Sequence, residues 1–385
     1  MLRRCLALGL ALATASLGAC GGSAPVNGDA VPAQPASSRV GHVFVIVLEN
    51  KDYDTTFGKD SPAPYLAQTL LAQGALLQNY YGIGHASLDN YIAMVSGQGP
   101  NLQTQSDCQI YTDFIGTGPL VPPQQAVGTG CVYPTTVASL PDQLEKAGLS
   151  WKGYMEDMGQ DPSRESATCG HPPLNRADNT QKATAGDQYA TRHNPFVYFH
   201  AIVDDPARCD AHVVNLAALP ADLASVGATP NFVFITPNLC NDGHDAPCAN
   251  GDPGGLISAN AFLQKWVPQI LAAPAFRKDG LLIVTFDESD GPQSDASACC
   301  GEGPGPNTPL PGITGLGGGR IGAVLLSPFI KPGTVSATAY NHYSLLRTVE
   351  DLFGLAYLGY AGASGQASFG ADVFTNVMPE LPPKQ

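Results

Sequence analysis

The segment Val43-Phe-Val-Ile-Val-Leu48 is an uninterrupted apolar run rich in β-branched residues, and it ends at the polar pair Glu49-Asn50. Such a run predicts a strand that is buried on both faces, as in a parallel sheet covered by helices. Polar residues at the carboxyl end of such a strand lie at the sheet edge where α/β proteins bind their ligands. Glu49 and Asn50 are therefore candidate site residues, although both residue types are also common in turns.

Similar apolar runs recur along the chain and alternate with helical patterns. Further strands are expected at 150–155, 231–238, 281–286 and 321–326, and helices at 64–77, 140–147, 256–272 and 344–353, with Ser344 as the N-cap of the last. The three intervening stretches rich in polar residues, glycine and proline are expected to be long loops, at 98–135, 159–195 and 291–319. This alternation predicts the α/β class, with a mostly parallel central sheet flanked by helices.

Residues 79–97 predict a loop that runs into a helix. After Ser87 the apolar residues recur at helical spacing, so Ser87 lies at or beside the N-cap. The free N–H groups and the positive dipole end of that first turn suit a phosphoryl group and favour a serine nucleophile. Asn90, one turn later, can offer its amide to a developing oxyanion. The alternative is that Ser87 is only an N-cap, as serine often is.

Several of the predicted strands and helices end in clusters of polar residues. A parallel sheet brings such ends to one edge, although they lie far apart in the sequence. The cluster residues are Glu49, Asn50, His85, Ser87, Asn90, Asp242, His244, Asp287 and Glu288. Carboxylate, amide and imidazole groups together suit a divalent metal ion, whose identity the sequence leaves open. Such an ion would lower the pKa of Ser87 and hold phosphoryl oxygens. Alternatively, the loop with Asp242 and His244 serves only as a cysteine-flanked structural loop.

The N-terminus resembles a bacterial lipoprotein signal. Arg3 and Arg4 precede an apolar segment that ends in Leu17-Gly-Ala-Cys20, which predicts a signal peptide over 1–19 and lipidation of Cys20. The alternative is an ordinary secretory signal with a chance cysteine. Residues 20–39 then read as the lipidated cysteine and a flexible linker, and residues 40–385 as one domain. We expect an exported protein anchored by lipid to the bacterial cell envelope, with the outer membrane favoured and the domain facing the periplasm or the exterior.

The charge balance is strongly acidic. The chain has 19 basic and 33 acidic residues, and loss of residues 1–19 removes two arginines and leaves a net charge of −16. A surface of this sign argues against nucleic acid as a partner. An anionic substrate then needs a metal ion or local positive groups, which is a second indication of a cation.

The cysteines that remain after Cys5 and Cys20 are eight in number, and an even number in an exported chain predicts disulfides of unknown connectivity. They are Cys108, Cys131, Cys169, Cys209, Cys240, Cys248, Cys299 and Cys300. A cysteine zinc cluster is the competing interpretation, although the sequence contains no C-x-x-C pair.

Several motifs resemble a bacterial phosphoesterase family that contains acid phosphatases and phospholipases C and belongs to the alkaline-phosphatase-like superfamily. Leu48-Glu49-Asn50-Lys-Asp-Tyr-Asp-Thr-Thr-Phe-Gly58 is similar to the opening motif, and His85-Ala-Ser87-Leu-Asp-Asn90-Tyr to the nucleophile segment. Phe286-Asp287-Glu288 and the run from Asn341-His342 to Phe353 match later motifs. The match spans residues 42–355 in order. It implies an alkaline-phosphatase-like fold and metal-assisted covalent phosphoryl transfer.

The resemblance also implies roles for individual residues. Metal ligands would be Glu49, Asn50, Asp287, Glu288 and the nucleophile Ser87; phosphate binding or protonation of the leaving group would fall to His85, His244 and His342, and substrate binding to Asn90, His85 and Asp242. His342 could instead be a structural cap of the following helix. One departure is Asp89, where the family usually has proline.

The sequence thus predicts an exported, metal-dependent phosphoesterase that acts through a phosphoserine at Ser87. Its substrate would be a small phosphate ester or a phospholipid headgroup, and a choice between monoester and diester is left open. A sulfatase or phosphomutase on the same scaffold is one alternative, but Ser87-Leu-Asp-Asn-Tyr lacks the proline and arginine usual in sulfatases. The other alternative is a catalytically silent binding lipoprotein on the cell surface.

Overall fold

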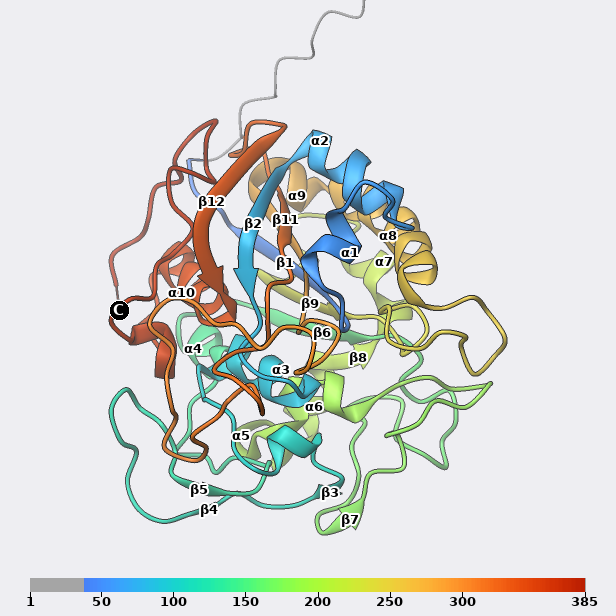
Figure 1. The fold of residues 1–385 in the computed structure, drawn as a ribbon, viewed down its shortest axis with the longest axis vertical. Coiled ribbons are helices and arrows are strands. Elements are labelled where there is room, and N and C mark those ends of the chain that lie inside the picture. The colour runs from blue at the N-terminus through green and yellow to red at the C-terminus, as the bar shows by residue number, and fades with distance from the viewer. Residues whose placement is uncertain (1–37, 385) are drawn as a thin grey trace, which may run out of the picture. The chain divides into compact units, whose positions relative to one another are not determined.

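The computed structural model describes residues 38–384, and its central element is one sheet of eight strands (Figure 1). Five neighbouring pairs run parallel, and β11 is antiparallel to both of its neighbours. In spatial order the strands are β12 (Thr334–Asn341), β2 (Ala75–Tyr81), β11 (Ala323–Leu326), β10 (Gly280–Phe286), β1 (His42–Leu48), β9 (Phe232–Thr236), β6 (Trp151–Met155) and β8 (Val213–Asn215). The prediction of an α/β fold with a mostly parallel sheet is confirmed.

Strand β1 lies between β10 and β9 in the middle of the sheet. His42 pairs with Gly280 at one end and Leu48 with Phe286 at the other, and every residue of both strands is buried. Burial on both faces explains why these strands read as unbroken apolar runs. Because the strands are parallel, the residues that follow Leu48, Phe286 and Thr236 emerge at the same edge of the sheet.

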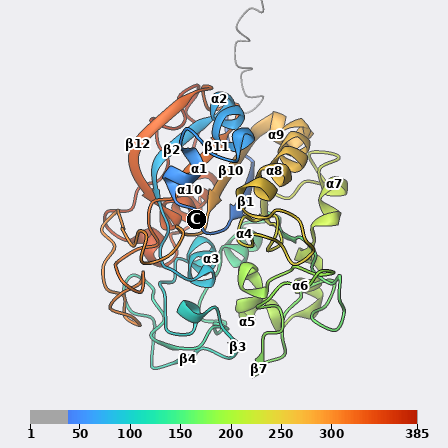
Figure 2. The same ribbon diagram turned by 45° about the vertical axis from the view of Figure 1, so that its right-hand side comes forward.

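Helices cover both faces of the sheet (Figures 1 and 2). On one face α3 packs against α4 and α10, and on the other α8 packs against α9 and η1. The longer helices are η1 (Tyr65–Leu70), α3 (Ser87–Ser96), α4 (Leu140–Lys146), α6 (Pro206–His212), α8 (Gly255–Ala272), α9 (Pro274–Asp279) and α10 (His342–Phe353). Shorter helices are α1 (Tyr53–Phe57), α2 (Leu71–Gln73), η2 (Thr104–Ser106), η3 (Thr191–His193), η4 (Pro195–Tyr198), α5 (His200–Val203), η5 (Leu216–Ala218), α7 (Leu219–Asp222) and η6 (Gly359–Gly362).

Two small sheets lie in the long loops. One joins β3 (Ile110–Tyr111) to β7 (Arg176–Ala177), and the other joins β4 (Ile115–Gly116) to β5 (Gly128–Thr129). These segments belong to stretches that the sequence predicts as loops. Their two-residue length leaves too little pattern for a sequence-based prediction.

The helix predicted over residues 64–77 is wrong at its end. Gly74 terminates it and β2 begins one residue later, so residues 79–81 are strand rather than the predicted loop. A Cβ atom at Gly74 would lie 2.1 Å from the carbonyl oxygen of Leu325, so glycine is required where the chain passes this close to β11. The apolar triplet at 75–77 continues the helical pattern by chance and hides the boundary.

Strand β12 and the start of α10 also differ from the prediction. Strand β12 is an edge strand whose residues are largely exposed, so it lacks the apolar signal of a buried strand. The side chain of Asn341 accepts a hydrogen bond of 2.9 Å from the backbone N–H of Ser344. Asn341 is therefore the N-cap, and the prediction of Ser344 in that role is wrong.

All eight described cysteines are paired in disulfides, so the predicted disulfides are confirmed and the alternative of a cysteine zinc cluster is wrong. The pairs are Cys108–Cys131, Cys169–Cys209, Cys240–Cys248 and the adjacent Cys299–Cys300. Each disulfide has at least one cysteine in or beside a stretch of irregular backbone, which it ties to another part of the chain.

The predicted signal peptide over 1–19 and the lipidation of Cys20 lie outside the described residues, as does most of the predicted linker at 20–39. Within residues 38–384, no helix combines the length and the apolar character needed to cross a bilayer.

Candidate active site

The ends of β1 and β10 place the pairs Glu49-Asn50 and Asp287-Glu288 against one another. The backbone N–H of Asn50 donates to Asp287 Oδ1 (3.0 Å), and the Asn50 amide nitrogen donates to Glu288 Oε1 (2.9 Å). Asn50 adopts a left-handed conformation (φ 47°), which asparagine tolerates better than most residues. The sequence prediction that these four residues converge is confirmed by this geometry.

Ser87 is the first residue of α3, and its hydroxyl points to the carboxylate of Glu49. The Ser87 Oγ donates to Glu49 Oε2 over 2.8 Å, and the Tyr91 hydroxyl donates to Glu49 Oε1 over 2.5 Å. The N-cap position belongs to Ala86, and no side chain caps there. The interpretation of Ser87 as a simple N-cap is therefore wrong, because its hydroxyl bonds a carboxylate on another element.

The loop that leads into α3 is held by Asn90. Its Oδ1 accepts from the backbone N–H groups of Ile83 (2.7 Å) and Gly84 (3.1 Å), while its amide nitrogen donates to the carbonyls of Gly84 and Ala86. Asn90 is fully buried. In this arrangement Asn90 fixes the loop that carries His85, and the predicted oxyanion contact would require its amide to leave these carbonyls.

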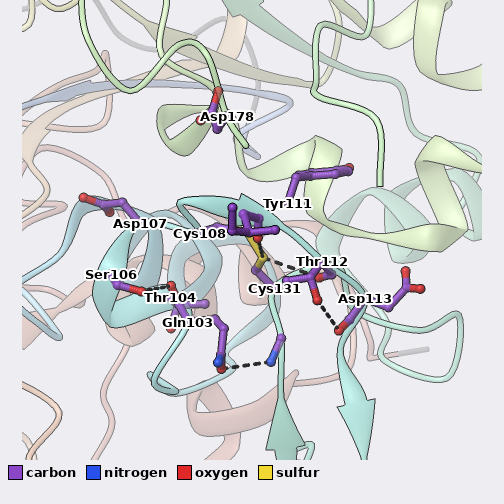
Figure 3. The surroundings of a disulfide bond; sticks show 12 residues. Gln103, Thr104, Ser106, Asp107, Cys108, Tyr111, Thr112, Asp113, Cys131 and Asp178 are labelled. Atoms are coloured by element: carbon purple, nitrogen blue, oxygen red, sulfur yellow. Dashed lines mark hydrogen bonds between the residues drawn. A yellow bond between two sulfur atoms is a disulfide. The ribbon is translucent and has the colours of Figure 1, made fainter. Parts of the chain in front are cut away.

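Asp107 occupies the start of α3 from a different segment. Its Oδ1 accepts a 3.0 Å hydrogen bond from the backbone N–H of Leu88. Asp107 directly precedes Cys108, and Figure 3 shows both beside the disulfide to Cys131. Burial raises the pKa of Asp107, while the charge of Arg192 and the bond from Leu88 oppose that rise. The disulfide thus anchors the loop whose carboxylate meets the positive end of the helix.

Asp89, at the position where the resemblance leads us to expect proline, packs its carboxyl group beside Gly84. A Cβ atom at Gly84 would lie 2.5 Å from both carboxylate oxygens, so Asp89 fills the space beside this glycine. Asp89 is 1% exposed, and neither of its oxygens has a hydrogen-bond partner among the described residues. Burial, with the nearby charge of Asp107, raises its pKa well above the usual value. Burial thus favours the neutral form of this carboxyl group over its charged form.

Two of the predicted histidines serve the site in different ways. His85 Nδ1 lies 3.0 Å from Glu288 Oε2, and its Nε2 lies 2.7 Å from the carbonyl oxygen of Asp295. His342 is fully buried, with Nε2 2.6 Å from the carbonyl of Asp287 and Nδ1 3.1 Å from the hydroxyl of Tyr80. Because a carbonyl only accepts, Nε2 of His342 carries the proton and Nδ1 accepts from Tyr80.

Burial lowers the pKa of His342 to about 4, so this imidazole is neutral at pH 7. With both nitrogens bonded and no exposed surface, His342 supports the end of β10 from α10. It does not cap its own helix, because that position belongs to Asn341. Burial also lowers the pKa of His85, while its bond to the Asp295 carbonyl opposes the shift.

His193 is a site residue that the sequence analysis missed. Its Nε2 lies 3.4 Å from Glu49 Oε2 and its Nδ1 3.4 Å from Asp242 Oδ2, and its ring stacks on Tyr91 with centroids 5.3 Å apart. Helix η3 positions it within residues 159–195, which read as a featureless loop. The sequence offers only the polar triplet Arg192-His193-Asn194 as a signal, and this resembles ordinary loop composition.

Glu49, His193 and Asp242 form a group that fits a metal ion. One ligand atom from each residue lies within 4.8 Å of the other two, and all three residues are buried. Several buried polar atoms here have no hydrogen-bond partner among residues 38–384. They are both ring nitrogens of His193, Oδ2 of Asp242, Oδ2 of Asp287 and Oδ1 of Asn50. Buried polar atoms normally find partners, and oxygen and imidazole donors suit a divalent cation.

The electrostatics of this group point the same way. Burial raises the pKa of Glu49 well above its usual value, and the charges of Asp287 and Asp242 add to the rise. Burial likewise raises the pKa of Asp242 to about 8 and lowers that of His193 well below its usual value. A cation among these residues would restore the ionised carboxylates, while a neutral imidazole is the form that ligates metals.

His244 lies at the margin of this edge rather than in the buried group. Its backbone N–H donates to Asp242 Oδ1 (2.7 Å), and its Nδ1 lies 2.8 Å from Asp245 Oδ1. The hydrogen bond to Asp245 raises the pKa of His244. The loop with Asp242 and His244 is tied by the Cys240–Cys248 disulfide, yet it also feeds the site. The loop thus brings the carboxylate of Asp242 within 3.4 Å of His193.

Comparisons with known proteins bear on this arrangement. The model of the Phosphoesterase family matches residues 59–356. The "Probable acid phosphatase" of Kluyveromyces lactis is 30% identical over 82% of this chain and 59% of its own length. A "Phosphate-repressible acid phosphatase" of Penicillium chrysogenum is 27% identical over 86% of this chain and 64% of its own length. The chain thus spans less than two thirds of these relatives.

A "Phosphatidylinositol-3-phosphatase" of Mycobacterium tuberculosis is similar along nearly its entire length. It is 27% identical, and the match covers 93% of this chain and 91% of that protein. Among solved structures, a protein in the alkaline phosphatase superfamily from Vibrio parahaemolyticus has a TM-score of 0.48 and 12% identity, covering 83% of this chain and 68% of its own.

Proposed function

The chain belongs to the phosphoesterase family, and we propose that it hydrolyses phosphate monoesters through a phosphoserine at Ser87. The observation that carries the proposal is the 2.8 Å hydrogen bond from the Ser87 hydroxyl, at the start of α3, to the buried carboxylate of Glu49. This is the arrangement of a nucleophile beside its proton acceptor. The names of the relatives, acid phosphatases and a phosphatidylinositol phosphatase, support a monoester rather than a diester.

The proposal includes a divalent metal ion. Glu49, Asp242 and His193 would hold it, with Asn50, Asp287 and Glu288 offering further oxygen ligands beside Ser87. When bound, such an ion supplies positive charge that lowers the pKa of the serine hydroxyl and polarises the phosphoryl oxygens. The family resemblance and the unpartnered buried oxygens support this ligand set.

Glu49 and His244 then carry out the proton transfers. In the first step Ser87 Oγ attacks phosphorus and passes its proton to Glu49; the Oγ–P bond forms and the bond from phosphorus to the leaving oxygen breaks. His244, whose ring is exposed and whose protonated form is favoured by the hydrogen bond to Asp245, gives its proton to the departing alkoxide. In the second step His244 accepts a proton from water as it attacks phosphorus. The Oγ–P bond breaks and Ser87 recovers its proton from Glu49.

The remaining residues position these groups. Asn90 holds the backbone of the loop before Ser87, and His342 holds the carbonyl of Asp287. His85, which contacts Glu288 and the Asp295 carbonyl, would bind a phosphoryl oxygen.

We further propose that the protein acts outside the cytoplasm, as a lipoprotein anchored through Cys20, with the phosphoesterase domain over residues 40–385. The four disulfides support an oxidising compartment. The substrate would be a small phosphate ester or a phospholipid headgroup, and the lipid anchor would hold the domain at a membrane. Growth with labelled palmitate tests this: wild type should carry label and Cys20→Ser should not.

The function is tested by trapping the intermediate. The purified full-length protein is treated with EDTA, reloaded with Mg²⁺, Mn²⁺, Zn²⁺ or Ca²⁺, and assayed on p-nitrophenyl phosphate and p-nitrophenyl phosphorylcholine. We expect turnover of the monoester only after reloading, and one phosphoryl group on the peptide with Ser87 after an acid quench. Preference for the phosphorylcholine substrate would indicate a phospholipase C instead. Inactivity with every metal on both substrates would favour a silent binding lipoprotein.

A further inference from the structure

A pocket of about 480 Å³ opens beside the reacting residues, and its charged lining is mostly basic. Its charged and titratable lining residues are Lys182, Arg192, His244 and Asp245. The single carboxylate in this lining, Asp245, already holds His244. The chain as a whole carries 33 acidic against 19 basic residues, so a pocket of this sign runs against the average charge of the protein.

Arg192 is the central cation of this pocket. It is 5% exposed, its Nη1 donates to the carbonyl of Gln181 (3.1 Å), and its Nε lies 3.8 Å from Asp107 Oδ2. Its Nη2 has no hydrogen-bond partner among the described residues, so one edge of the guanidinium is available to a ligand. A buried arginine with a free edge is suited to planar, two-point binding of an anion.

Lys182 adds a second cation at the outer side of the pocket. The side chain of Lys182 is exposed, and its carbonyl accepts a 3.0 Å hydrogen bond from Arg164 Nη2, which fixes the backbone at this position. Arg164 is itself paired with the buried Asp187 (3.0 Å). The backbone at Lys182 is thus fixed by its hydrogen bond to Arg164.

The pocket adjoins the reacting centre through its own lining residues. Arg192 directly precedes His193, and the backbone N–H of His244 bonds the carboxylate of Asp242. Through Asp107, Arg192 also reaches the backbone of Leu88, next to the nucleophile. Since His244, the proposed proton donor, itself lines the basic pocket, a leaving group that receives its proton from His244 would lie next to this pocket.

A second cavity near the site has the opposite character. It has a volume of about 200 Å³ and is lined by Ile83, Tyr343 and Tyr360 among others, with Glu302 as the charged group in its lining. Burial raises the pKa of Glu302 well above its usual value. This cavity offers no positive charge to an anion, so the basic pocket is the better place for one.

We propose that the pocket formed by Lys182 and Arg192 binds a second anionic group of the substrate, so that preferred substrates are phosphate monoesters whose leaving group carries another phosphate or phosphonate. This inference rests on the proposed function and adds the substrate class. Lys182 and Arg192 give the pocket positive charge that offsets the repulsion between this acidic protein and a doubly anionic ligand. Charge-assisted bonds to Arg192 supply both attraction and orientation.

The test compares two substrates that differ only in the second anion. Butyl phosphate and 4-phosphonobutyl phosphate have the same reacting group, and the phosphonate carbon–phosphorus bond resists hydrolysis. For the metal-loaded wild type we expect kcat/KM to be about tenfold or more higher for the phosphonate compound, mainly through KM. Lys182→Gln should reduce this preference severalfold. Arg192→Gln should abolish it, and Arg192→Lys should keep a part of it.

The matched control is Lys331→Gln, which removes the same charge at the opposite edge of the sheet, after β11 and before β12. It should leave the preference unchanged. Equal kcat/KM for both substrates in wild type would overturn the inference, as would an Arg192→Gln variant that loses both activities in proportion. Turnover of butyl phosphate reports the proposed function separately. If neither substrate reacts, calorimetric binding of butane-1,4-diphosphonate to wild type and Lys182→Gln still tests the pocket.

Discussion

The two ends of the paired strands β1 and β10 have the same backbone geometry and opposite side-chain chemistry. At the first end, where the two strands begin, His42 Nδ1 lies 2.5 Å from Asp279 Oδ1, and the backbone N–H of Gly41 donates to the Asp279 carbonyl. One acid meets one base there, and both are about 5% exposed. At the second end, where the two strands finish, Glu49 and Asp287 are buried beside other carboxylates. Too few hydrogen-bond donors are present there to pair all the carboxylate oxygens.

This difference separates a structural polar group from a functional one. A buried carboxylate is costly unless it is paired, so a fold selected for stability alone would pair or remove the acids at the second end. The strands are equally buried throughout, and the core does not require acids at that position. The unpartnered oxygens therefore mark the end where a ligand completes the structure. Substitutions at the second end should therefore change catalysis, whereas substitutions at the first end should change stability alone.

The largest expected effect is on catalysis at the second end. Ser87→Ala removes the nucleophile and should lower kcat by about a thousandfold or more, while the loss of one hydrogen bond to Glu49 should lower stability by only about 1–2 kcal/mol. Ser96→Ala is the matched control, because Ser96 lies at the other end of α3, is equally buried, and bonds only backbone groups there, donating to the carbonyl of Ile92 and accepting from the N–H of Gln98. Steady-state kinetics and thermal unfolding check both variants. Comparable kcat in Ser87→Ala and Ser96→Ala would remove Ser87 from the reaction.

Glu49→Gln is expected to lower activity and raise stability together. Losing the proton acceptor and metal ligand should reduce kcat about a hundredfold or more. In metal-free protein the variant should be more stable than wild type at pH 7, by about 1 kcal/mol or more, because it removes one of the crowded buried acids. Urea unfolding with EDTA measures this, and a less stable variant would contradict the comparison.

The pH dependence of that stability follows from the raised pKa of Glu49 in the folded state. Below the ordinary pKa of a glutamate, both folded and unfolded chains are protonated and the residue has no cost. As the pH rises past that value, the unfolded chain releases its proton while the folded chain retains it, so stability falls with rising pH. Glu49→Gln should flatten this fall in the metal-free protein.

The polar pair at the second end can be predicted from the sequence, because the strand and the polar residues that directly follow it are recognised from neighbouring positions. Val43–Leu48 reads as a buried strand, and a polar pair at its end lies at the ligand edge in any parallel sheet. The ligand set beyond this needs tertiary information. His193 reaches Glu49 only because η3 folds against Tyr91, and no spacing in residues 159–195 records that contact. The same holds for the role of Asp107 at α3, which depends on the Cys108–Cys131 disulfide.

The fold shows the same division between local and distant information. Strands buried on both faces are recovered, whereas the edge strand β12 is missed because its exposed residues carry no apolar pattern. The boundary between α2 and β2 fails at Gly74, where the need for glycine comes from a neighbouring strand rather than from the helix itself. Contacts between distant segments decide the elements that local patterns leave open.

At the first end of the strands, a substitution should affect stability alone. His42→Ala leaves the buried carboxylate of Asp279 without its 2.5 Å partner and should destabilise the protein by about 2–3 kcal/mol. The kcat and KM of the folded variant should equal those of wild type, because the pair lies a full strand length from Ser87. Denaturant unfolding and kinetics on the same preparation measure both quantities. A fall in kcat with full metal loading would show that the two ends are coupled.

The smallest expected effect concerns a second histidine–aspartate pair, which sits at the functional end. His244 and Asp245 lie 2.8 Å apart, much as His42 and Asp279 do, but His244 is exposed to the basic pocket. The bond to Asp245 raises the pKa of His244, so its protonated form persists to higher pH. If that proton is given to the leaving group, kcat falls as the pH rises through this pKa.

Asp245→Asn removes the bond and should move the alkaline limb of the kcat profile to lower pH. The loss at pH 7 should be less than about tenfold, since His244 itself remains, and stability should barely change at this partly exposed position. His244→Gln, by contrast, should remove the limb. An unshifted limb in Asp245→Asn would mean that another group protonates the leaving alkoxide. A histidine–aspartate pair can thus stabilise the fold where it is buried and tune a proton donor where it meets the substrate, and its position at one end of the sheet or the other decides between the two.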